Sequence, residues 1–419
     1  MEKKILTDFE NTYKNSLLND EVKLKKEFLN KFIEKGFPSK KLESWKFSDL
    51  NHIINKNIEN LIFYNDTTKS NKIDESLYLK NLEHNKIVFI NGKLEEIKFE
   101  HEDNNKIKIS KETKIDDNLF KDNALIDLNN AFAIYNYKIH VEDGYNVKKP
   151  VVIYHTTNSE LNSTNINIQL NFLLGENSSL KLIDTFNDIS DKNFINIYYN
   201  FKLKKDSVLK NFKLDNLINN NIKYSFNNID QETNSVSETF ILSNGSKFFK
   251  NEINCNLKGK YSSAFVNGIF SLSENRHHEI KTNINHLIEN TKSYQLIKSV
   301  LDNSSKAVYQ GKIYVDKDAQ KTDGYQLSKA ILLNENSEFN AKPELEIYAD
   351  DVKCSHGSAS GSLNDNSIFY LRSRGLNYKE AKNLLIKGFL LDVIEKITDE
   401  EIKNIIKSTM GLSKWILKT

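Results

Sequence analysis

The longest uninterrupted pattern in this chain runs from Val151 to Leu363, where short segments alternate apolar and polar residues and no helical period intervenes. In residues 165–174, isoleucine, leucine and phenylalanine alternate with asparagine and glutamine, and residues 194–203 show the same alternation. A period of two residues is typical of strands with one buried face. Clusters rich in Asn, Ser, Asp and Gly separate the segments and indicate turns.

This succession of strands excludes some folds and favours one. A doubly wound parallel sheet needs helices between its strands, so it is disfavoured, whereas a sandwich, a barrel and a solenoid remain. Roughly 200 residues of strand favour the solenoid, because stacked rungs lengthen a protein without enlarging one core, although no clean repeat is visible. We expect a mainly β fold with three regions: an N-terminal helical region (1–84), a β-solenoid (85–363) and a C-terminal helical region (364–419).

Helical patterns interrupt or follow the strands. Residues 119–135 predict a short helical interlude. Near the C-terminus, Gly375 suits the C′ position of a preceding helix, and Asn377 can cap a helix over residues 378–397. The run 398–401 (Thr-Asp-Glu-Glu) has the form of a capping box that opens a last amphipathic helix.

Composition excludes several classes of function. The net charge is only +2, so no basic field indicates a nucleic-acid partner. The first residues lack the apolar core of a signal peptide, and no apolar run approaches the roughly 20 residues of a membrane helix. Two distant cysteines, Cys255 and Cys354, argue against a disulfide framework and favour the cytoplasm. Two thiols also cannot supply an ordinary four-thiolate iron–sulfur site.

Signatures of common enzymes are missing as well. There is no phosphate-binding loop of the P-loop type and no dinucleotide-binding fingerprint. The run 357–361 resembles a nucleophile elbow only superficially, because its central residue is Ala359. We therefore expect a protein that does not hydrolyse ATP by itself and has no catalytic residues of its own.

The stretch Lys342–Gly361 concentrates the residues that could carry chemistry. It begins as an alternating strand, and if the extension persists, Asp350, Cys354 and His356 point to the same side. A thiol and an imidazole two residues apart on one face can reach one metal ion or one partner. The alternative is a buried structural cysteine beside a hydrogen-bonded histidine, and pattern alone favours this alternative.

The other cysteine and three histidines are expected to be structural. Cys255 alternates with asparagines and joins an apolar face, which predicts a core position. His277 and His278 are adjacent in a strand and point to opposite faces, so they are not expected to share a metal. His286 lies on an apolar face, which predicts a buried residue with its hydrogen bonds satisfied.

Several long motifs together resemble those of one family. The chain is similar to the SufB/SufD family of iron–sulfur cluster assembly proteins, and the residues in its motifs resemble those of the SufD branch. The resemblance is dense over residues 286–390, and a short N-terminal signature supports it. The motifs are Glu43-Ser-Trp-Lys46, Tyr309-Gln-Gly-Lys-Ile-Tyr-Val315, Ala319-Gln-Lys-Thr-Asp-Gly-Tyr-Gln326, Lys342-Pro-Glu-Leu-Glu-Ile-Tyr-Ala-Asp-Asp-Val-Lys-Cys-Ser-His-Gly357, Phe369-Tyr-Leu-Arg-Ser-Arg-Gly375 and Gly388-Phe389.

This resemblance implies a right-handed parallel β-helix and a complex with a SufB-like paralogue and an ABC-type ATPase, SufC. It implies that His356, with Cys354 as a helper or a buried neighbour, supports assembly of a transient cluster or iron at the interface with the paralogue, while no cofactor is held stably by this chain alone. It also implies that the C-terminal helical region binds the ATPase, with candidate contacts at Tyr370, Arg372, Arg374, Leu385 and Phe389.

Some points stay open within this resemblance. The chain departs from the family at Gly324, where Ala is common, and in the run 357–361, and neither departure is expected to touch the candidate ligands. A homodimer that forms before the paralogue joins is left open. The alternative functions are a purely structural partner of the ATPase with no ligand role and, as a different class, a carbohydrate-binding solenoid.

Overall fold

The computed structural model describes residues 2–14, 20–63, 78–80, 82–112, 122–158 and 161–411. Its helices are α1 (Glu2–Thr12), α2 (Asp20–Lys35), the 3₁₀ turn η1 (Glu43–Trp45), α3 (Leu50–Asn57), α4 (Ala124–Phe132), α5 (Asp365–Ser373), α6 (Tyr378–Ile394) and α7 (Glu400–Thr409). Its strands are β1 (Asn85–Ile90), β2 (Lys93–Lys98), β3 (Ile107–Glu112), β4 (Asn136–Val141), β5 (Val151–Thr157), β6 (Asn165–Leu174), β7 (Ser179–Asp188), β8 (Phe194–Leu203), β9 (Val208–Asp215), β10 (Ile222–Gln231), β11 (Val236–Ser243), β12 (Phe248–Leu257), β13 (Ser263–Leu272), β14 (His277–His286), β15 (Lys292–Leu301), β16 (Lys306–Val315), β17 (Thr322–Leu332), β18 (Glu338–Ile347) and β19 (Val352–Gly361).

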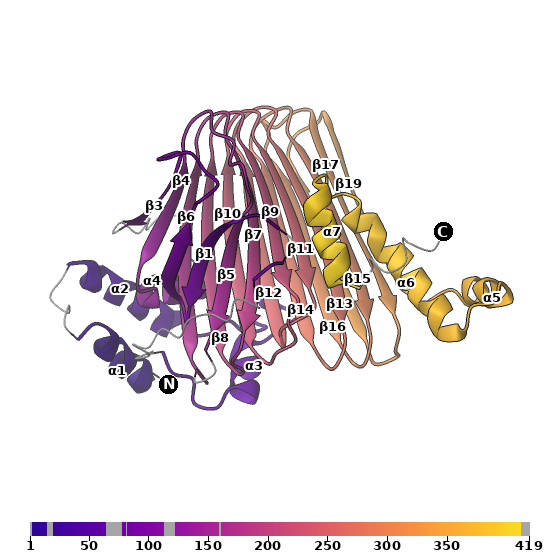
Figure 1. Cartoon of the computed structure of the whole chain (residues 1–419), viewed down its shortest axis with the longest axis horizontal. Coiled ribbons are helices and arrows are strands. Elements are labelled where there is room, and N and C mark those ends of the chain that lie inside the picture. Colours follow the sequence, from indigo (N-terminus) through magenta and orange to yellow (C-terminus); the bar gives the residue numbers. More distant parts are fainter. Residues whose placement is uncertain are drawn as a thin grey trace.

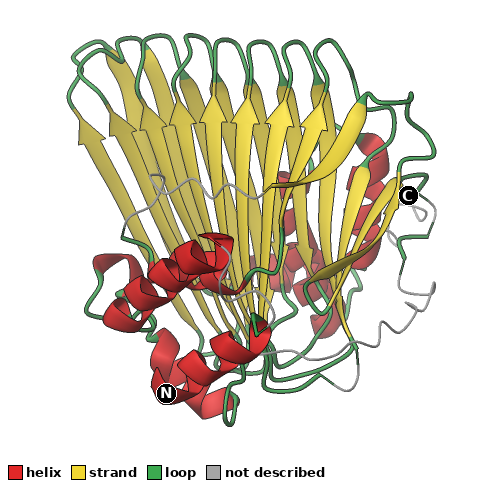
Figure 2. Ribbon diagram, turned by 90° about the vertical axis from the view of Figure 1, so that its left-hand side faces the viewer, coloured by secondary structure: helices red, strands yellow, loops and turns green. Residues whose placement is uncertain are grey.

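The strands wind into a parallel β-solenoid of about eight turns (Figure 1). Odd-numbered strands from β5 to β19 stack in one sheet and even-numbered strands from β4 to β18 stack in the other, so each rung contributes one strand to each sheet. Neighbouring strands of these two stacks run parallel, as Figure 2 shows, and they are in register over most of their length, whereas β2 and β3 add antiparallel to β1 and β4. The predicted mainly β solenoid with helices at both ends is confirmed.

Inward positions of successive rungs form apolar columns that fill the interior. Phe172, Phe201, Ile229, Cys255 and Ile284 occupy one such column, each directly above the last. All five are buried, and the rings of Phe172 and Phe201 stack with centroids 4.5 Å apart. Each buried side chain of this size contributes about 1.5–3 kcal/mol relative to exposure. The alternation in the sequence thus becomes a continuous core, and the predicted core position of Cys255 is confirmed.

The interior also holds ionised groups near the N-terminal rungs. Asp184 accepts hydrogen bonds from Lys213 at 2.8 Å and from His155 at 2.7 Å, and all three side chains are buried. Burial opposes the charge on Asp184, but Lys213 and His155 outweigh it and hold the pKa of this carboxyl below its usual range. A charge this deeply buried is tolerated because its partners are in place.

An outward column of asparagines runs along the sheet of even-numbered strands. Asn228 donates from Nδ2 to Asn200 Oδ1 at 2.9 Å, Asn254 donates to Asn228 at 2.8 Å, and Asn283 donates to Asn254 at 3.0 Å. These residues are in register in successive rungs. Asparagine amides at matching positions of adjacent strands form such ladders, because each amide can donate to one neighbour and accept from the other.

The N-terminal helices pack on the outer face of the same sheet. Apolar residues of α1–α4 share one core cluster with outward residues of β8, β10 and β12. In η1, Trp45 lies beside Tyr224 with ring centroids 5.8 Å apart, and the ammonium of Lys250 lies 4.5 Å from the centre of the Trp45 ring. The N-terminal signature therefore anchors the helical region to the middle of the solenoid.

The C-terminal helices cover the outer face of the other sheet. Leu390, Val393 and Ile394 of α6 and Ile402 and Ile406 of α7 are buried against its odd-numbered strands. The first half of α6 and all of α5 extend away from the solenoid, at the right of Figure 1. Among the described helices, none combines the length and the apolar character needed to cross a membrane.

Most predicted helix signals are confirmed, and one is wrong. Asn377 caps α6 in a full capping box with Glu380, and Gly375 follows α5 with φ +96°. The predicted interlude over 119–135 is α4, whose cap is Asn123, and residues 119–121 lie outside the described part. The last helix starts one residue later than predicted: Asp399, not Thr398, accepts the hydrogen bond from Ile402 N.

Candidate functional site

The C-terminal end of the solenoid exposes two strands that have only one neighbour each. β18 pairs with β16 and β19 pairs with β17, and within the described residues no strand lies on their other side. Their side chains are half-buried or exposed, whereas the strands of the middle rungs are mostly buried. Unpaired N–H and C=O groups of an edge strand are a template for another chain.

Two features of β18 limit which chains can pair with this free edge. Pro343 lies in β18, in register with Gly311, and proline is tolerated in sheets mainly where a strand has a free edge. The outward residues of β18 are mostly charged, and Lys342 pairs with both Glu344 and Glu43 of the N-terminal region. Charged side chains and proline protect an edge against indiscriminate pairing.

The candidate thiol lies on the inward face of β19. Cys354 packs with Val352, Leu345 and the buried Ile313 at the open end of the core. Burial is the main reason that the pKa of the Cys354 thiol is raised above its usual value. The group is therefore a protonated thiol in the free chain, and a metal ion or a partner would have to displace its proton.

The candidate imidazole follows two residues later and is exposed. His356 is in register with Gln326 of β17, and within the described residues it makes no hydrogen bond or ion pair. Because side chains alternate along a strand, His356 and Cys354 share the inward face, as predicted. The structure thus places the pair side by side on the last rung, with the thiol half-covered and the imidazole free.

Two expectations about this stretch are wrong. Extension does not persist from Leu345 to His356: β18 ends at Ile347 and β19 begins at Val352, so the exposed Asp350 lies in the loop between the sheets and not on the Cys354 face. The departure at Gly324 does touch a candidate ligand. Gly324 is in register with Cys354, and a Cβ atom there would lie 3.3 Å from Cys354 Sγ, a contact tighter than usual.

Cys255 and His286 are buried, and His277 and His278 point to opposite faces, as predicted. Cys255 is buried, and burial raises the pKa of its thiol to about 12. His278 is buried and contacts Ser243 and the Ser246 carbonyl, while its neighbour His277 faces the other way. His286 is buried and contacts Thr291 and Ser293. Among the described residues, no three or more His, Cys, Asp or Glu side chains are grouped so as to hold a metal ion.

The C-terminal candidates fall into two groups. Tyr370, Arg372 and Arg374 are exposed on the projecting α5 and at its end, and the guanidinium of Arg374 lies 5.2 Å from the centre of the Tyr370 ring. Leu385 and Phe389 are half-buried on α6. Phe389 packs on the solenoid, where Lys298 lies 4.5 Å from its ring and donates to its carbonyl.

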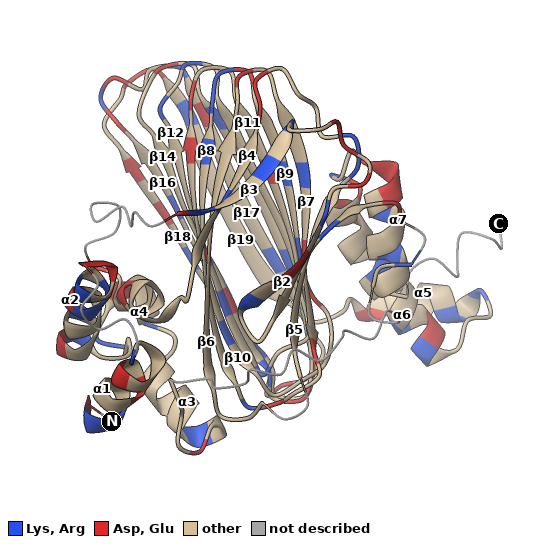
Figure 3. Ribbon diagram, turned by 60° about the vertical axis from the view of Figure 1, so that its left-hand side comes forward, with Lys and Arg blue, Asp and Glu red and all other residues tan. Residues whose placement is uncertain are grey.

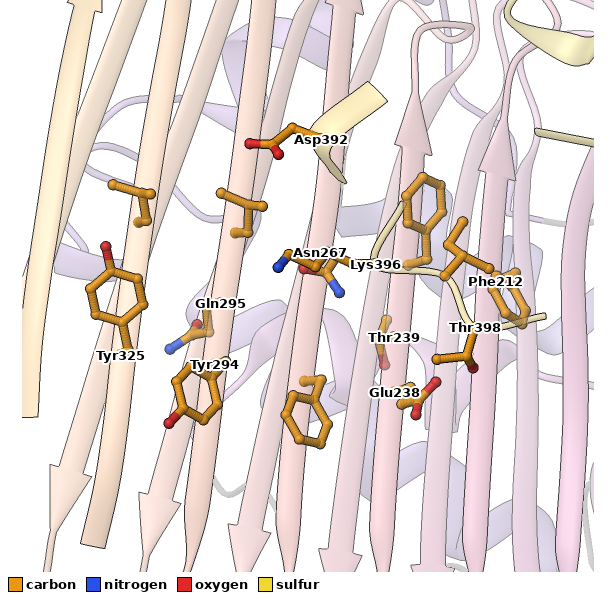
Figure 4. Close-up of a pocket in the computed structure, with 15 residues that line it drawn as sticks. Phe212, Glu238, Thr239, Asn267, Tyr294, Gln295, Tyr325, Asp392, Lys396 and Thr398 are labelled. Carbon is orange, nitrogen blue, oxygen red and sulfur yellow. The ribbon is translucent and has the colours of Figure 1, made fainter. Parts of the chain in front are cut away.

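Sequence reasoning missed two further surface features. Phe369, Tyr378 and Leu384 add exposed apolar area to α5 and α6. A groove of about 550 Å³ lies between the end of α6 and the sheet. Figure 4 shows the side chains that line it. The strands contribute apolar lining that includes the column Phe265, Tyr294 and Tyr325, and the C-terminal region contributes Asp392, Lys396 and Thr398.

No motif could have indicated the groove, because it is built from residues about 30 positions apart that only the register brings together. The rings of Phe265 and Tyr294 are nearly parallel, with centroids 6.0 Å apart. Charges elsewhere on the surface are mixed: Figure 3 shows acidic and basic residues interspersed over the strands and helices.

Comparisons with known proteins agree with these features. Residues 133–389 match the family model "SUF system FeS cluster assembly, SufBD core domain", which is more than half of the chain. The chain is 25% identical over 392 residues to the iron–sulfur cluster assembly protein SufD of Escherichia coli, an alignment that covers 91% of this chain and 90% of that protein.

Two further relatives show the breadth of the similarity. SufB of Bacillus subtilis is 23% identical over 294 residues, 69% of this chain and 63% of that protein. The chloroplastic protein ABCI7 of Arabidopsis thaliana is 25% identical over 281 residues, 64% of this chain and 58% of that protein. The last strand of this parallel solenoid carries the Cys-Ser-His-Gly motif, and the family model covers most of the solenoid. This chain therefore belongs to the SufBD family of the SUF system of iron–sulfur cluster assembly.

Proposed function

We propose that this chain is a SufD-like scaffold subunit that pairs with a SufB-like paralogue, binds a SufC-like ATPase, and supports de novo cluster assembly and iron acquisition. The observation that carries the proposal is the unpaired last rung with Cys354 and His356 on its inward face. The chain would be non-catalytic, with ATP hydrolysis in the ATPase. Its two unpaired cysteines suit the reducing cytoplasm.

The open edge supports pairing with a second solenoid. β18 and β19 offer two rows of backbone donors and acceptors, and a chain of the same architecture can add its own terminal strands to them. Such a junction would enclose the last rung. His356 and Cys354 would then face residues of the paralogue, so that each chain would supply part of one shared site.

The chemistry of the two side chains suits iron as a substrate. Neutral imidazole and thiolate are both competent iron ligands, and mixed sets of this kind occur in iron–sulfur proteins. His356 is accessible without any change in the chain, whereas Cys354 must lose its proton and gain exposure. We therefore assign the first contact with iron to His356 and a helper role to Cys354.

The decisive experiment is His356→Ala in the complex reconstituted with the paralogue and the ATPase. We expect the complex to form, because the exposed imidazole of His356 makes no hydrogen bond or ion pair within the described residues, and the cluster yield to fall severalfold. Ser355→Ala, the exposed neighbour on the opposite face, is the matched control and should leave the yield unchanged. A normal yield with His356→Ala would leave this chain as a purely structural partner of the ATPase.

A second experiment tests the ATPase contact. Deleting residues 364–419 would uncover apolar surface beneath Val393 and Ile402, so point substitutions are cleaner. Phe369→Ala with Tyr370→Ala removes two exposed rings from the projecting helix and should weaken ATPase binding at least tenfold, since aromatic anchors dominate interfaces. Ile218→Ala, an equally exposed apolar residue in a turn, is the control; equal binding by both variants would move the contact elsewhere.

A further inference from the structure

Arginine is rare in this chain, and two of its arginines lie on the projecting helix α5 and at its end. Lysine and arginine together number 59, and only three of these residues are arginines: Arg276, Arg372 and Arg374. Lysine occupies all the other positions, so a need for positive charge alone does not account for an arginine. A guanidinium differs from an ammonium in its planar fork of N–H donors, which can bind both oxygens of one carboxylate.

Arg276, the arginine outside this helix, uses its fork within the chain. It is buried in the turn before β14, where Nη1 donates to the carbonyl oxygen of Asn219 at 2.8 Å and Nη2 lies 3.8 Å from a carboxylate oxygen of Glu274. Arg372 and Arg374 are exposed, and within the described residues their side chains make no hydrogen bond or ion pair. Positive charge suits the C-terminal end of α5, but lysine would supply it equally well. The two forks are therefore free to bind a group outside the chain.

The exposed face of α5 has two aromatic rings at its centre and an arginine on each side. Ile368 is the buried residue of this helix, and successive helical residues are turned by roughly 100°. Phe369 and Tyr370 therefore point away from the buried side, where they are 74% and 56% exposed, and Arg372 and Arg374 flank them. The guanidinium of Arg374 lies 5.2 Å from the centre of the Tyr370 ring, and stacking of this kind leaves the N–H edge of the guanidinium free.

We propose that the two arginines of α5 each bind a carboxylate of the ATPase, at the borders of an apolar groove that receives the two rings. This inference rests on the proposed function and adds the chemistry of the contact. Among the groups on a protein surface, a carboxylate matches both the charge and the two-donor geometry of a guanidinium. A helix that inserts apolar anchors into a groove is a common form of recognition, and tyrosine and arginine are enriched among the residues that contribute most to binding.

The test compares binding of the ATPase to the full native chain and to two double variants, by calorimetric titration. One variant combines Arg372→Lys with Arg374→Lys, and the other combines Arg372→Gln with Arg374→Gln. Lysine keeps the charge and loses the fork, so we expect the Kd of the lysine variant to rise at least tenfold and to lie closer to that of the glutamine variant than to the native value. Lys202→Gln, which removes an exposed charge from the other sheet, is the control and should bind like the native chain.

A lysine variant whose Kd lies closer to the native value would overturn the inference, because charge alone would then account for the contact. Equal binding by all three chains would overturn it as well. Thermal unfolding checks that the fold is intact, as expected for exposed side chains on a helix that extends away from the solenoid (Figure 1). A native chain that does not bind the ATPase would overturn the proposed function together with the inference, so the two failures are distinguishable.

Discussion

The two ends of the solenoid are finished in different ways. At the N-terminal end, β1 is covered by the antiparallel β2 and β4 by the antiparallel β3, so the chain supplies its own last strands. At the C-terminal end, β18 and β19 stop with one parallel neighbour each. Antiparallel strands end the winding, because no further parallel rung can follow them in register. The contrast shows that one end is closed by the chain's own strands, whereas the other leaves two strand edges unpaired among the described residues.

The interior differs in the same direction. Near the N-terminal rungs, ionised Asp184 and Lys213 are enclosed, and their neighbours are fully buried. In the last rung, Cys354 and Val352 are only half-buried and His356 is exposed. We therefore expect substitutions in the first and middle rungs to lower the free energy of unfolding most. Substitutions in the last rung, which carries the candidate site, should lower it little.

The largest expected effect comes from breaking the enclosed ion pair. Asp184→Ala leaves Lys213 buried without its carboxylate and should lower the free energy of unfolding by about 3–5 kcal/mol. Urea denaturation measures this loss. Glu346→Ala, which removes an exposed partner of Lys312 in β18, is the control and should cost less than about 1 kcal/mol. Equal losses in the two variants would contradict the contrast between the ends.

The next effect depends on pH. Burial lowers the pKa of both His278 and His286 to about 4 in the folded chain, below the usual 6.5. Between these values the unfolded chain binds more protons than the folded one, so stability is complete at neutral pH and is lost as the pH falls from 6.5 toward 4.

At pH 5, this loss should amount to about 1–2 kcal/mol for each histidine. Unfolding at pH 7 and pH 5 measures it. His278→Gln should remove its share of the pH dependence even if the variant is less stable at both values. A slope that stays the same in this variant would show that His278 does not contribute.

The smallest effect tests the asparagine column. Asn228 donates to Asn200 and accepts from Asn254 and Asn256, so Asn228→Ala breaks three hydrogen bonds and should cost about 1–2 kcal/mol. Asn340→Ala in the exposed edge strand β18, where the amide contacts Glu338 only, should cost less than about 0.5 kcal/mol. Thermal unfolding of both variants compares a middle rung with the last one, and a larger loss at Asn340 would reverse the order.

The fold class could be predicted from the sequence, because apolar and polar residues that alternate with a period of two over such a length are compatible with few architectures. The sequence did not reveal the repeat, since successive asparagines of one column are separated by 28, 26 and 29 residues. Because the turns vary in length, the rungs do not give a repeat of constant length in the sequence. For the same reason, the aromatic column of the groove could not be predicted, because it depends on register.

The candidate site was predictable in part. Alternation placed Cys354 and His356 on one face, and the motif around them indicated the family. The loop at Asp350 was not predictable from alternation, because Tyr348–Asp351 carry no proline or glycine to mark the turn. The contact between Gly324 and Cys354 was missed because residues 30 positions apart lie side by side only after winding.

Pro343 has a consequence for which strands can pair with the open end of the solenoid. Prolines in sheets sit where the missing N–H would face away from the neighbouring strand, so the free row of β18 is one donor short, while β19 keeps a complete row. Because β2 and β3 close the other end of the solenoid, pairing through backbone rows is confined to the C-terminal end of the described strands. With one incomplete row, β18 would pair best with a strand that places no carbonyl oxygen opposite Pro343.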